Sequence, residues 1–274
     1  MIIFDDVTKT FPDGTVAVDR FSLTLPAHRT TVLVGSSGCG KTTLLRMINR
    51  MVEPTSGRIS IDGHDVAAAE PVKLRRGIGY VMQNAGLLPH VTVIDNIATV
   101  PRLQGTRKAT ARERARELMQ TVGLDPTLAR RYPGELSGGQ QQRVGVARAL
   151  AAEPNILLMD EPFGAVDPIV RAELQQELLR LQREVDKTIV FITHDIDEAF
   201  LLGDQVAILE HGARIAQVGS PSEIMEAPAS EFVASFIGAT RGRRALRIKP
   251  TERGLAVVDG LGRTQGMLVP ESDT

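Results

Sequence analysis

Residues 35–43 read GSSGCGKTT, and they directly follow a short apolar run, residues 30–34 (TTVLV). The β-rich run predicts a buried strand, and apolar residues at helical spacing over 41–51 predict a helix after the loop. Glycines let such a loop curl so that successive backbone N–H groups face one anion, and the helix N-terminus adds a partial positive charge. A strand, a glycine-rich loop and a helix in this order predict a phosphate-binding loop in an α/β fold.

The residue types at the end of this loop fit a nucleoside triphosphate. Lys41 is placed to reach the β- and γ-phosphates, and the Thr42 hydroxyl is placed to ligate Mg²⁺. Cys39 is the one cysteine of the chain; a reactive thiol and a small side chain that fills a variable position are both open, and the second is favoured. The predicted ATP-binding residues of the loop are Gly35, Ser36, Ser37, Gly38, Cys39, Gly40, Lys41, Thr42 and Thr43.

A second apolar run ends in two acids. Residues 156–159 (ILLM) predict a strand that is buried on both faces, and Asp160 and Glu161 follow them. Parallel α/β sheets bind their ligands at the carboxyl ends of the strands. At this position Asp160 resembles a Walker B aspartate, which holds Mg²⁺ in its second shell, and Glu161 fits the general base that orients and polarises the attacking water. The alternative, a solvated acidic loop, is weakened by the apolar residues before the acids and by Pro162 after them.

A second glycine-rich helix start lies at residues 136–140 (LSGGQ), before apolar residues at helical spacing over 141–152. Ser137, Gly138 and Gly139 thus offer the N–H groups of a helix N-terminus to an anion. The spacing leaves two arrangements open. One chain binds two phosphates, or the chain shares one nucleotide with a copy of itself.

Together with Gln83 and His194, these stretches resemble, in this order, the nucleotide-binding subunit of an ABC transporter, over roughly residues 1–240. The resemblance implies that the LSGGQ turn, including Gln140, faces the γ-phosphate across a head-to-tail dimer that buries two ATP molecules. It implies that Gln83 senses Mg²⁺ and water, and that His194, at the end of residues 188–194, contacts the γ-phosphate. Closure of the dimer would then complete each site and exclude water.

Two further site residues come from the resemblance. Asp167, in residues 164–167 (GAVD), is implied to carry communication between the two sites. Many relatives have SALD there, so Gly164 and Val166 are departures that leave the contacts of this loop less certain. Phe11 fits the aromatic residue that stacks on adenine, with an ordinary core phenylalanine as the alternative.

The fold class predicted is α/β, because strands alternate with helices. The resemblance implies a P-loop NTPase (RecA-like) core. The alternation of residues 1–30 predicts an antiparallel β layer, and His211-Gly212 predicts a hairpin. The expected organisation is a cassette over 1–240, with core residues 1–85 and 150–220, a helical subdomain over about 86–149 and C-terminal helices over 221–240, followed by a short basic, β-like tail over 241–274.

Composition limits the partners. The chain has 274 residues and a net charge of −1, which gives no electrostatic argument for nucleic acid. No apolar run reaches the roughly 18–20 residues that span a bilayer, and the N-terminus lacks the pattern of a secretory signal. The chain is therefore expected to stay where it is made and to act on any membrane process through a partner. The ABC resemblance implies a place at the cytoplasmic face of the cell membrane, bound to a transmembrane permease and served indirectly by a substrate-binding protein.

The most specific resemblance concerns the solute. Residues 47–57, 75–83 and 160–171 resemble ATPases of osmoprotectant importers, which move glycine betaine, choline, carnitine or proline. Residues 86–93 (GLLPHVTV) lie where such ATPases receive the coupling helix of the permease; a packed linker is the alternative. An importer of another small solute, such as an amino acid, and a non-transport ABC ATPase stay open. The tail, residues 241–274, is too short for the pair of CBS modules that relatives often carry.

Overall fold

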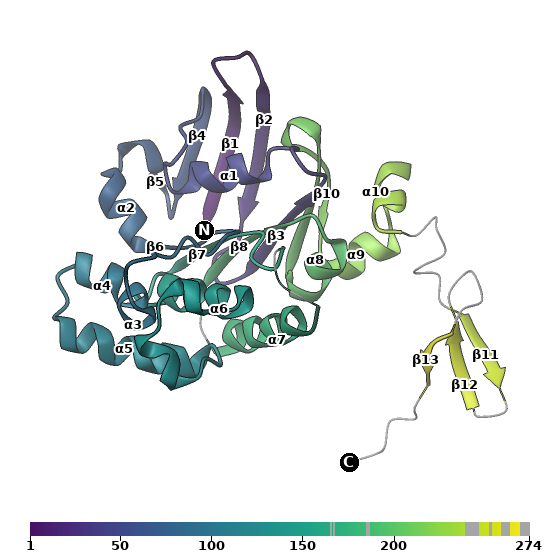
Figure 1. Ribbon diagram of the computed structural model, residues 1–274. Helices are drawn as coiled ribbons and strands as arrows, with labels where there is room; N and C mark the ends of the chain where they lie inside the picture. The colour runs from purple at the N-terminus through teal and green to yellow at the C-terminus, as the bar shows by residue number, and fades with distance from the viewer. Residues whose placement is uncertain are drawn as a thin grey trace.

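The computed structural model describes residues 1–164, 166, 168–184, 187–238, 247–251, 254–258 and 264–268. At the centre of this described part is a six-stranded sheet in the order β10-β9-β3-β8-β7-β6 (Figure 1). Its strands from β9 to β6 run parallel, and β10 pairs antiparallel with β9 as the hairpin signal predicts. The strands are β3 (Thr30–Gly35), β6 (Ile78–Val81), β7 (Ile156–Asp160), β8 (Thr188–Thr193), β9 (Gln205–Glu210) and β10 (Arg214–Gly219).

Both faces of the central sheet are buried. In β3, Val32 and Val34 join one hydrophobic cluster, whereas Leu33 joins the other. The same alternation recurs in β8, where Phe191 faces the first cluster and Val190 the second. Because successive side chains of a strand point to opposite faces, a continuous apolar run is what a sheet covered on both sides requires.

A second sheet, four-stranded within the described residues, covers one face in the antiparallel order β2-β1-β4-β5. Phe4 and Phe21 pack edge to face in its core, with ring centroids 5.2 Å apart. The sequence predicts an antiparallel layer from residues 1–30 alone, but β4 and β5 join it from beyond the first helix. The elements are β1 (Ile2–Thr10), β2 (Val16–Leu25), β4 (Ser56–Ile61), β5 (His64–Asp65) and α1 (Lys41–Ile48).

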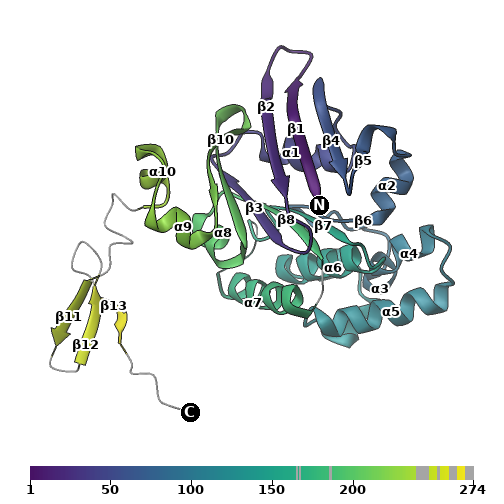
Figure 2. The same cartoon turned by 180° about the vertical axis from the view of Figure 1, so that it is seen from behind.

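Helices cover the opposite face, as Figures 1 and 2 show from two sides. They are α6 (Gly138–Leu150), α7 (Pro168–Glu184) and α8 (Ile196–Leu202). Helix α6, which begins at the LSGGQ turn, also packs against α3, α5 and β6. Between β5 and α6 the chain forms the other helical segments: η1 (Val66–Ala68), α2 (Pro71–Gly77), α3 (Val93–Ile97), α4 (Thr99–Leu103), α5 (Lys108–Thr121), η2 (Pro126–Arg130) and η3 (Pro133–Glu135).

Several predicted element ends are shifted. Helix α1 ends at Ile48 rather than at 51, because the chain turns at Arg50, which has a φ of +54°. Residues 78–83 (IGYVMQ) predict a strand, but β6 ends at Val81, since its pairing with β7 stops there. The sequence predicts a helix over 167–185 with Asp167 as its N-cap and Pro168 as its first residue; α7 begins at Pro168, whereas Asp167 and Val185 lie outside the described residues.

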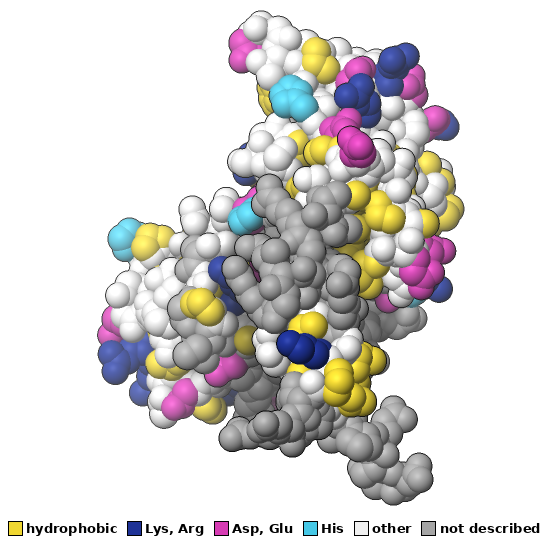
Figure 3. Space-filling view, turned by 90° about the vertical axis from the view of Figure 1, so that its right-hand side faces the viewer, with side chains coloured by type: hydrophobic (Ala, Val, Ile, Leu, Met, Phe, Trp, Pro, Cys, Tyr) yellow, Lys and Arg dark blue, Asp and Glu magenta, His cyan; other side chains and the backbone are white. Residues whose placement is uncertain are grey.

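The C-terminal part continues through η4 (His211–Ala213), α9 (Pro221–Glu226) and α10 (Glu231–Phe236). A small antiparallel sheet follows, made of β11 (Arg247–Thr251), β12 (Gly254–Val258) and β13 (Thr264–Met267). Apolar side chains gather in the lower part of Figure 3, and Ile248, Leu255 and Leu268 are the large exposed ones of this sheet and its end. Within the described part of the chain, no helix has both the length and the apolar character needed to cross a bilayer.

Candidate nucleotide-binding site

The glycine-rich loop joins β3 to α1 and is fixed from both sides. Gly40 has a φ of +111°, and a Cβ there would lie 2.4 Å from the carbonyl oxygen of Ala17, so glycine is required. The carbonyl of Cys39 accepts a hydrogen bond from the Ala213 N–H at 2.6 Å. Gly40 caps α1 without a side-chain hydrogen bond, so the first N–H groups of the helix have no acceptor within it. The loop is shaped to receive an anion.

Lys41 is the buried cation of this loop, with 4% of its surface exposed. Its Nζ donates hydrogen bonds to the carbonyl oxygens of Gly35 at 2.8 Å and Ser36 at 2.9 Å. The ion pairs found among the described residues include no acidic partner for it. Burying an ammonium group without a counter-charge is costly, so a phosphate at the loop would supply what Lys41 lacks.

Cys39 lies inside the core rather than at the surface. It is 1% exposed and belongs to the hydrophobic cluster that contains Leu44 and Leu45 of α1. Lys41 Nζ donates to Cys39 Sγ at 3.8 Å, and the other neighbours of Cys39 in the cluster are apolar. A free thiol that is buried in this way packs as a small side chain. Its position supports the expectation of a small side chain that fills space, not that of a reactive thiol.

Asp160, the last residue of β7, is held by two hydroxyl groups. Thr42 Oγ1 donates to Asp160 Oδ1 at 3.1 Å, and the Tyr80 hydroxyl donates to Asp160 Oδ2 at 3.1 Å. Burial, and then the charge of Asp160, raise the pKa of Tyr80 to about 12, so its hydroxyl keeps its proton. The sequence analysis did not single out Tyr80, because nothing in an apolar strand distinguishes a phenol that packs from one that donates.

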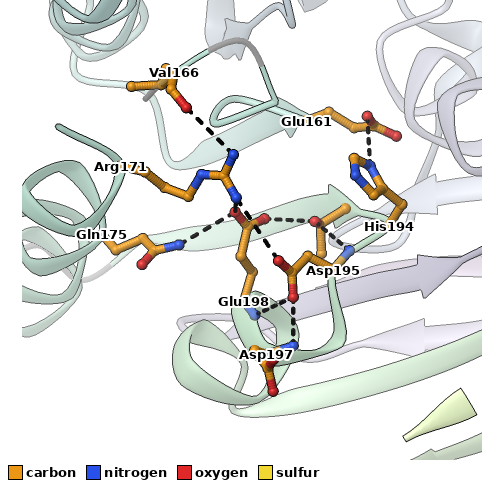
Figure 4. A network of polar contacts seen from close by, with 9 residues as sticks. Glu161, Val166, Arg171, Gln175, His194, Asp195, Asp197 and Glu198 are labelled. Atoms are coloured by element: carbon orange, nitrogen blue, oxygen red, sulfur yellow. Dashed lines mark hydrogen bonds and ion pairs between the residues drawn. The ribbon is translucent and has the colours of Figure 1, made fainter. Parts of the chain in front are cut away.

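Glu161 and His194 meet because their strands are neighbours. The Glu161 N–H donates to the Ile192 carbonyl at 3.0 Å, which fixes the end of β7 against β8. His194 Nδ1 then lies 3.1 Å from Glu161 Oε2 (Figure 4). Glu161 has a φ of +44°, an unusual conformation for this residue type and one found at functional sites. The parallel sheet thus brings together two residues that are far apart in the chain.

Gln83 lies near Glu161, in the turn after β6. A Cβ on Gly164 would lie 3.7 Å from Gln83 Nε2 and 3.9 Å from Glu161 Oε2. These are ordinary van der Waals distances, so Gly164 is not required sterically, and Gln83 and Glu161 flank it. Gly164, where many relatives have serine, therefore leaves space next to Glu161, the predicted general base.

The oxygen ligands present fit a magnesium ion. Mg²⁺ prefers oxygen ligands and usually keeps waters and substrate phosphates in its shell. The hydroxyl of Thr42 and the carboxylate of Asp160 already touch, and Gln83 lies near Glu161. Among the described residues, no group of three or more His, Cys, Asp or Glu side chains is arranged to hold a metal by itself. A metal here would depend on Thr42, Asp160 and the nucleotide.

The LSGGQ turn is built as a helix cap whose hydrogen bonds close within the turn. Ser137 Oγ accepts from the Gln140 N–H at 3.3 Å, and Gln140 Oε1 accepts from the Ser137 N–H at 3.0 Å, which is a capping box. Ser137 and Gly138 are exposed. These hydrogen bonds join the turn to itself and do not join it to Lys41 or Glu161.

The two assignments with the least support differ in outcome. Phe11 is half-buried, lies outside both hydrophobic clusters and has Lys9 Nζ 5.3 Å from its ring centroid. Its ring is therefore not an ordinary core side chain. Asp167 lies outside the described residues, but Val166 before it is buried.

A family model described as ABC transporter matches residues 18–164. The chain belongs to the ABC transporter family. The match includes the phosphate loop, the LSGGQ turn and the acidic end of β7, so the motif-based resemblance is confirmed. The ABC cassette also has relatives in solved structures. A dimeric ATP-binding cassette in a post-hydrolysis state with ADP and Pi has a TM-score of 0.74 and 32% identity, covering 81% of this chain and 99% of that chain. This confirms the predicted P-loop NTPase fold.

Curated relatives of this ABC cassette are transport ATP-binding proteins. The glycine betaine/carnitine/choline transport ATP-binding protein of Bacillus subtilis is 53% identical over 88% of this chain and 63% of its own length. The choline transport ATP-binding protein of the same organism is 47% identical over the whole chain and 70% of its own length. The glycine betaine uptake system ATP-binding protein of Escherichia coli is 48% identical over 91% of this chain and 80% of its own length. The chain thus spans about two thirds of the length of the Bacillus relatives.

Proposed function

We propose that this chain is the ATP-hydrolysing subunit of an ABC importer for a small solute of the quaternary ammonium osmoprotectant class. One observation carries the hydrolytic part of the proposal. Two neighbouring strand ends place Asp160 against Thr42 and Glu161 against His194, each at 3.1 Å, beside a loop with a buried lysine. This is the arrangement that phosphoryl transfer to water requires.

Each residue then has one task. The N–H groups of the loop and Lys41 bind the β- and γ-phosphates, and Phe11 stacks on the base. Mg²⁺ held by Thr42 and Asp160, with Gln83 nearby, would neutralise charge that develops on the phosphoryl oxygens. Glu161 orients the attacking water and accepts its proton. His194, fixed through Nδ1 by Glu161, directs its other nitrogen to the γ-phosphate.

A second copy of the chain completes the site in this proposal. In the exposed capping box the side chains of Ser137 and Gln140 each accept from the backbone N–H of the other residue, which leaves the N–H groups of Gly138 and Gly139 to an outside anion. The proposed anion is the γ-phosphate bound to the partner copy in a head-to-tail dimer, with Asp167 passing information between the two sites. The dimeric state of similar cassettes supports this arrangement. Hydrolysis removes the charge that holds the two copies together, so the dimer opens.

The proposed contact with the permease is the segment 86–93. Asn96, which is fully buried, donates to the carbonyl oxygens of Leu88 at 3.1 Å and Val91 at 2.7 Å and accepts from the Leu88 N–H at 2.8 Å. Arg148 donates to the Gly86 carbonyl at 2.7 Å. These bonds fix the backbone of a segment whose Leu88 side chain stays 45% exposed. A rigid segment with an exposed apolar side chain suits docking of a helix at the cytoplasmic face of the membrane.

The solute class rests on the relatives, whose printed names refer to glycine betaine, choline and carnitine. The test is uptake of labelled choline and labelled glycine betaine by cells that lack the gene. The intact chain is expected to restore uptake, and a Glu161→Gln chain made in equal amount is expected not to. If the chain restores uptake of a labelled amino acid instead, the importer serves another solute. If it affects the uptake of none of these solutes, the proposed importer function is wrong.

A further inference from the structure

Arg171, in the first turns of α7, lies between two segments of the proposed site. Its Nη2 donates a hydrogen bond to the carbonyl oxygen of Val166 at 3.4 Å, next to Asp167 in the chain. Its Nη1 lies 4.0 Å from Asp195 Oδ2 and 3.9 Å from Glu198 Oε1. Figure 4 shows this guanidinium between the Val166 segment and the turn after His194. Its Nε is buried and has no hydrogen-bond partner.

Glu198, on α8, is the other centre of this network. Its carboxylate is almost fully buried, with Oε2 accepting from the Thr193 hydroxyl at 2.6 Å and Oε1 accepting from Gln175 Nε2 at 3.3 Å. The Thr193 hydroxyl oxygen in turn accepts from the Asp195 N–H at 3.0 Å. The residues on both sides of His194 are therefore tied to Glu198, directly or through one hydroxyl.

Burial raises the pKa of Glu198, which means that the fold places this carboxylate where its charge is disfavoured. Because folding raises this pKa, Glu198 contributes its full stability to the fold below its unfolded pKa. That contribution is lost as the pH rises through the folded pKa. The contacts of the carboxylate with Thr193, Gln175 and Arg171 point to a role in positioning these segments.

We propose that Arg171 and Glu198 are positioning residues that link the segment before Asp167 to the segment that carries His194. The link deepens the proposed function and rests on it, because it concerns the geometry of the same site. Arg171 lies at the outer limit of ion-pair distance from both carboxylates, so a small shift of the Val166 segment changes which of them it binds. Docking of the partner copy on the Asp167 loop would then be passed to His194 within one chain.

The first test compares two arginines of one helix. Arg171→Met keeps much of the length of the side chain but removes its donors and its charge. The matched control is Arg180→Met, since Arg180 is exposed and donates to the Thr121 carbonyl at 2.8 Å, away from the site. We expect Arg171→Met to lower kcat at saturating ATP roughly tenfold or more, as misplacement of a catalytic group does. ATP affinity should be unchanged in both variants, and kcat should be unchanged in the control.

The second test uses Glu198→Gln, which keeps an acceptor for the Thr193 hydroxyl and removes the charge that attracts Arg171. Because the amide has the shape of the carboxyl group and keeps the contact with Thr193, this variant is expected to keep the melting temperature of the parent chain. Its kcat should fall by a factor similar to that of Arg171→Met. If the two residues act as one link, the double variant should lose no more than either single variant.

A wild-type kcat for either Arg171→Met or Glu198→Gln overturns the link, and so do losses that multiply in the double variant. If Arg171→Met does not fold, the kcat of Glu198→Gln decides the question alone. His194→Ala separates this inference from the proposed site. If His194→Ala keeps full ATPase activity, the role proposed for His194 is wrong. If His194→Ala loses activity while Arg171→Met hydrolyses ATP normally, only the proposed link between Arg171 and His194 is wrong.

Discussion

Replacing Tyr80 by phenylalanine should weaken the proposed magnesium site without changing the nucleotide loop. The variant removes one hydroxyl and keeps the ring that packs in β6. Asp160 is 5% exposed and receives one hydrogen bond on each oxygen, from Thr42 and from Tyr80. Without the phenol, Asp160 Oδ2 loses its donor in a site that water barely reaches, and the carboxylate is free to rotate away from Thr42.

The size of the effect follows from that geometry. A hydrogen bond to a charged group contributes about 1.5–3 kcal/mol, and partners of metal ligands typically change metal affinity about 10–100-fold. We therefore expect the Mg²⁺ concentration for half-maximal ATPase activity to rise at least about tenfold. The melting temperature should fall by about 4–8 °C if about 2 kcal/mol is lost.

The assay is a Mg²⁺ titration of ATPase activity at saturating ATP, with a melting curve for each variant. Tyr132→Phe is the matched control, because Tyr132 is the second of the two tyrosines and is 48% exposed. Tyr132→Phe should leave both readouts unchanged. If Tyr80→Phe keeps the Mg²⁺ dependence of the parent chain, the phenol does not position Asp160, even where the melting temperature falls.

Three further outcomes are expected. Glu161→Gln should bind ATP but hydrolyse it at least about a hundredfold more slowly, and size exclusion with ATP should show a dimer that persists; normal turnover would remove Glu161 as the base. Ser137→Arg should bind ATP as a monomer yet fail to turn over, because the arginine would fill the turn that we propose faces the partner copy; an active Ser137→Arg enzyme would separate LSGGQ from the site. The hydrogen bonds from Arg112, at 2.8 and 2.6 Å, hold the pKa of Asp95 below its usual 3.8. The stability they give is present above that value and is lost as the pH falls through the lowered pKa, so the melting-temperature difference between the parent and Arg112→Met should be full at pH 7 and shrink towards pH 3. A difference that does not change with pH would mean that the arginine acts by packing.

Much of the candidate site follows from local sequence. The loop needs Gly40 at a positive φ, the helix needs a free N-terminus, and Lys41 and Thr42 follow at fixed offsets, so one short stretch determines their geometry. The apolar run before Asp160 likewise fixes its place at a strand end. The capping box at Ser137 is local too, since its two hydrogen bonds close within four residues.

Tertiary structure alone decided which strand ends are neighbours. Strands buried on both faces are apolar throughout, so their sequences carry no signal for their order, and β7 pairs with β8 through a register that only the folded sheet sets. That pairing puts His194 against Glu161, and the pairing of β6 with β7 puts Tyr80 against Asp160. Pairing of β4 with β1 crosses the whole of α1 and has no local signature. The sequence by itself determined which functional groups lie in each loop, helix cap and strand end, because these local structures depend on neighbouring residues. Contacts between turns were decided by long-range packing.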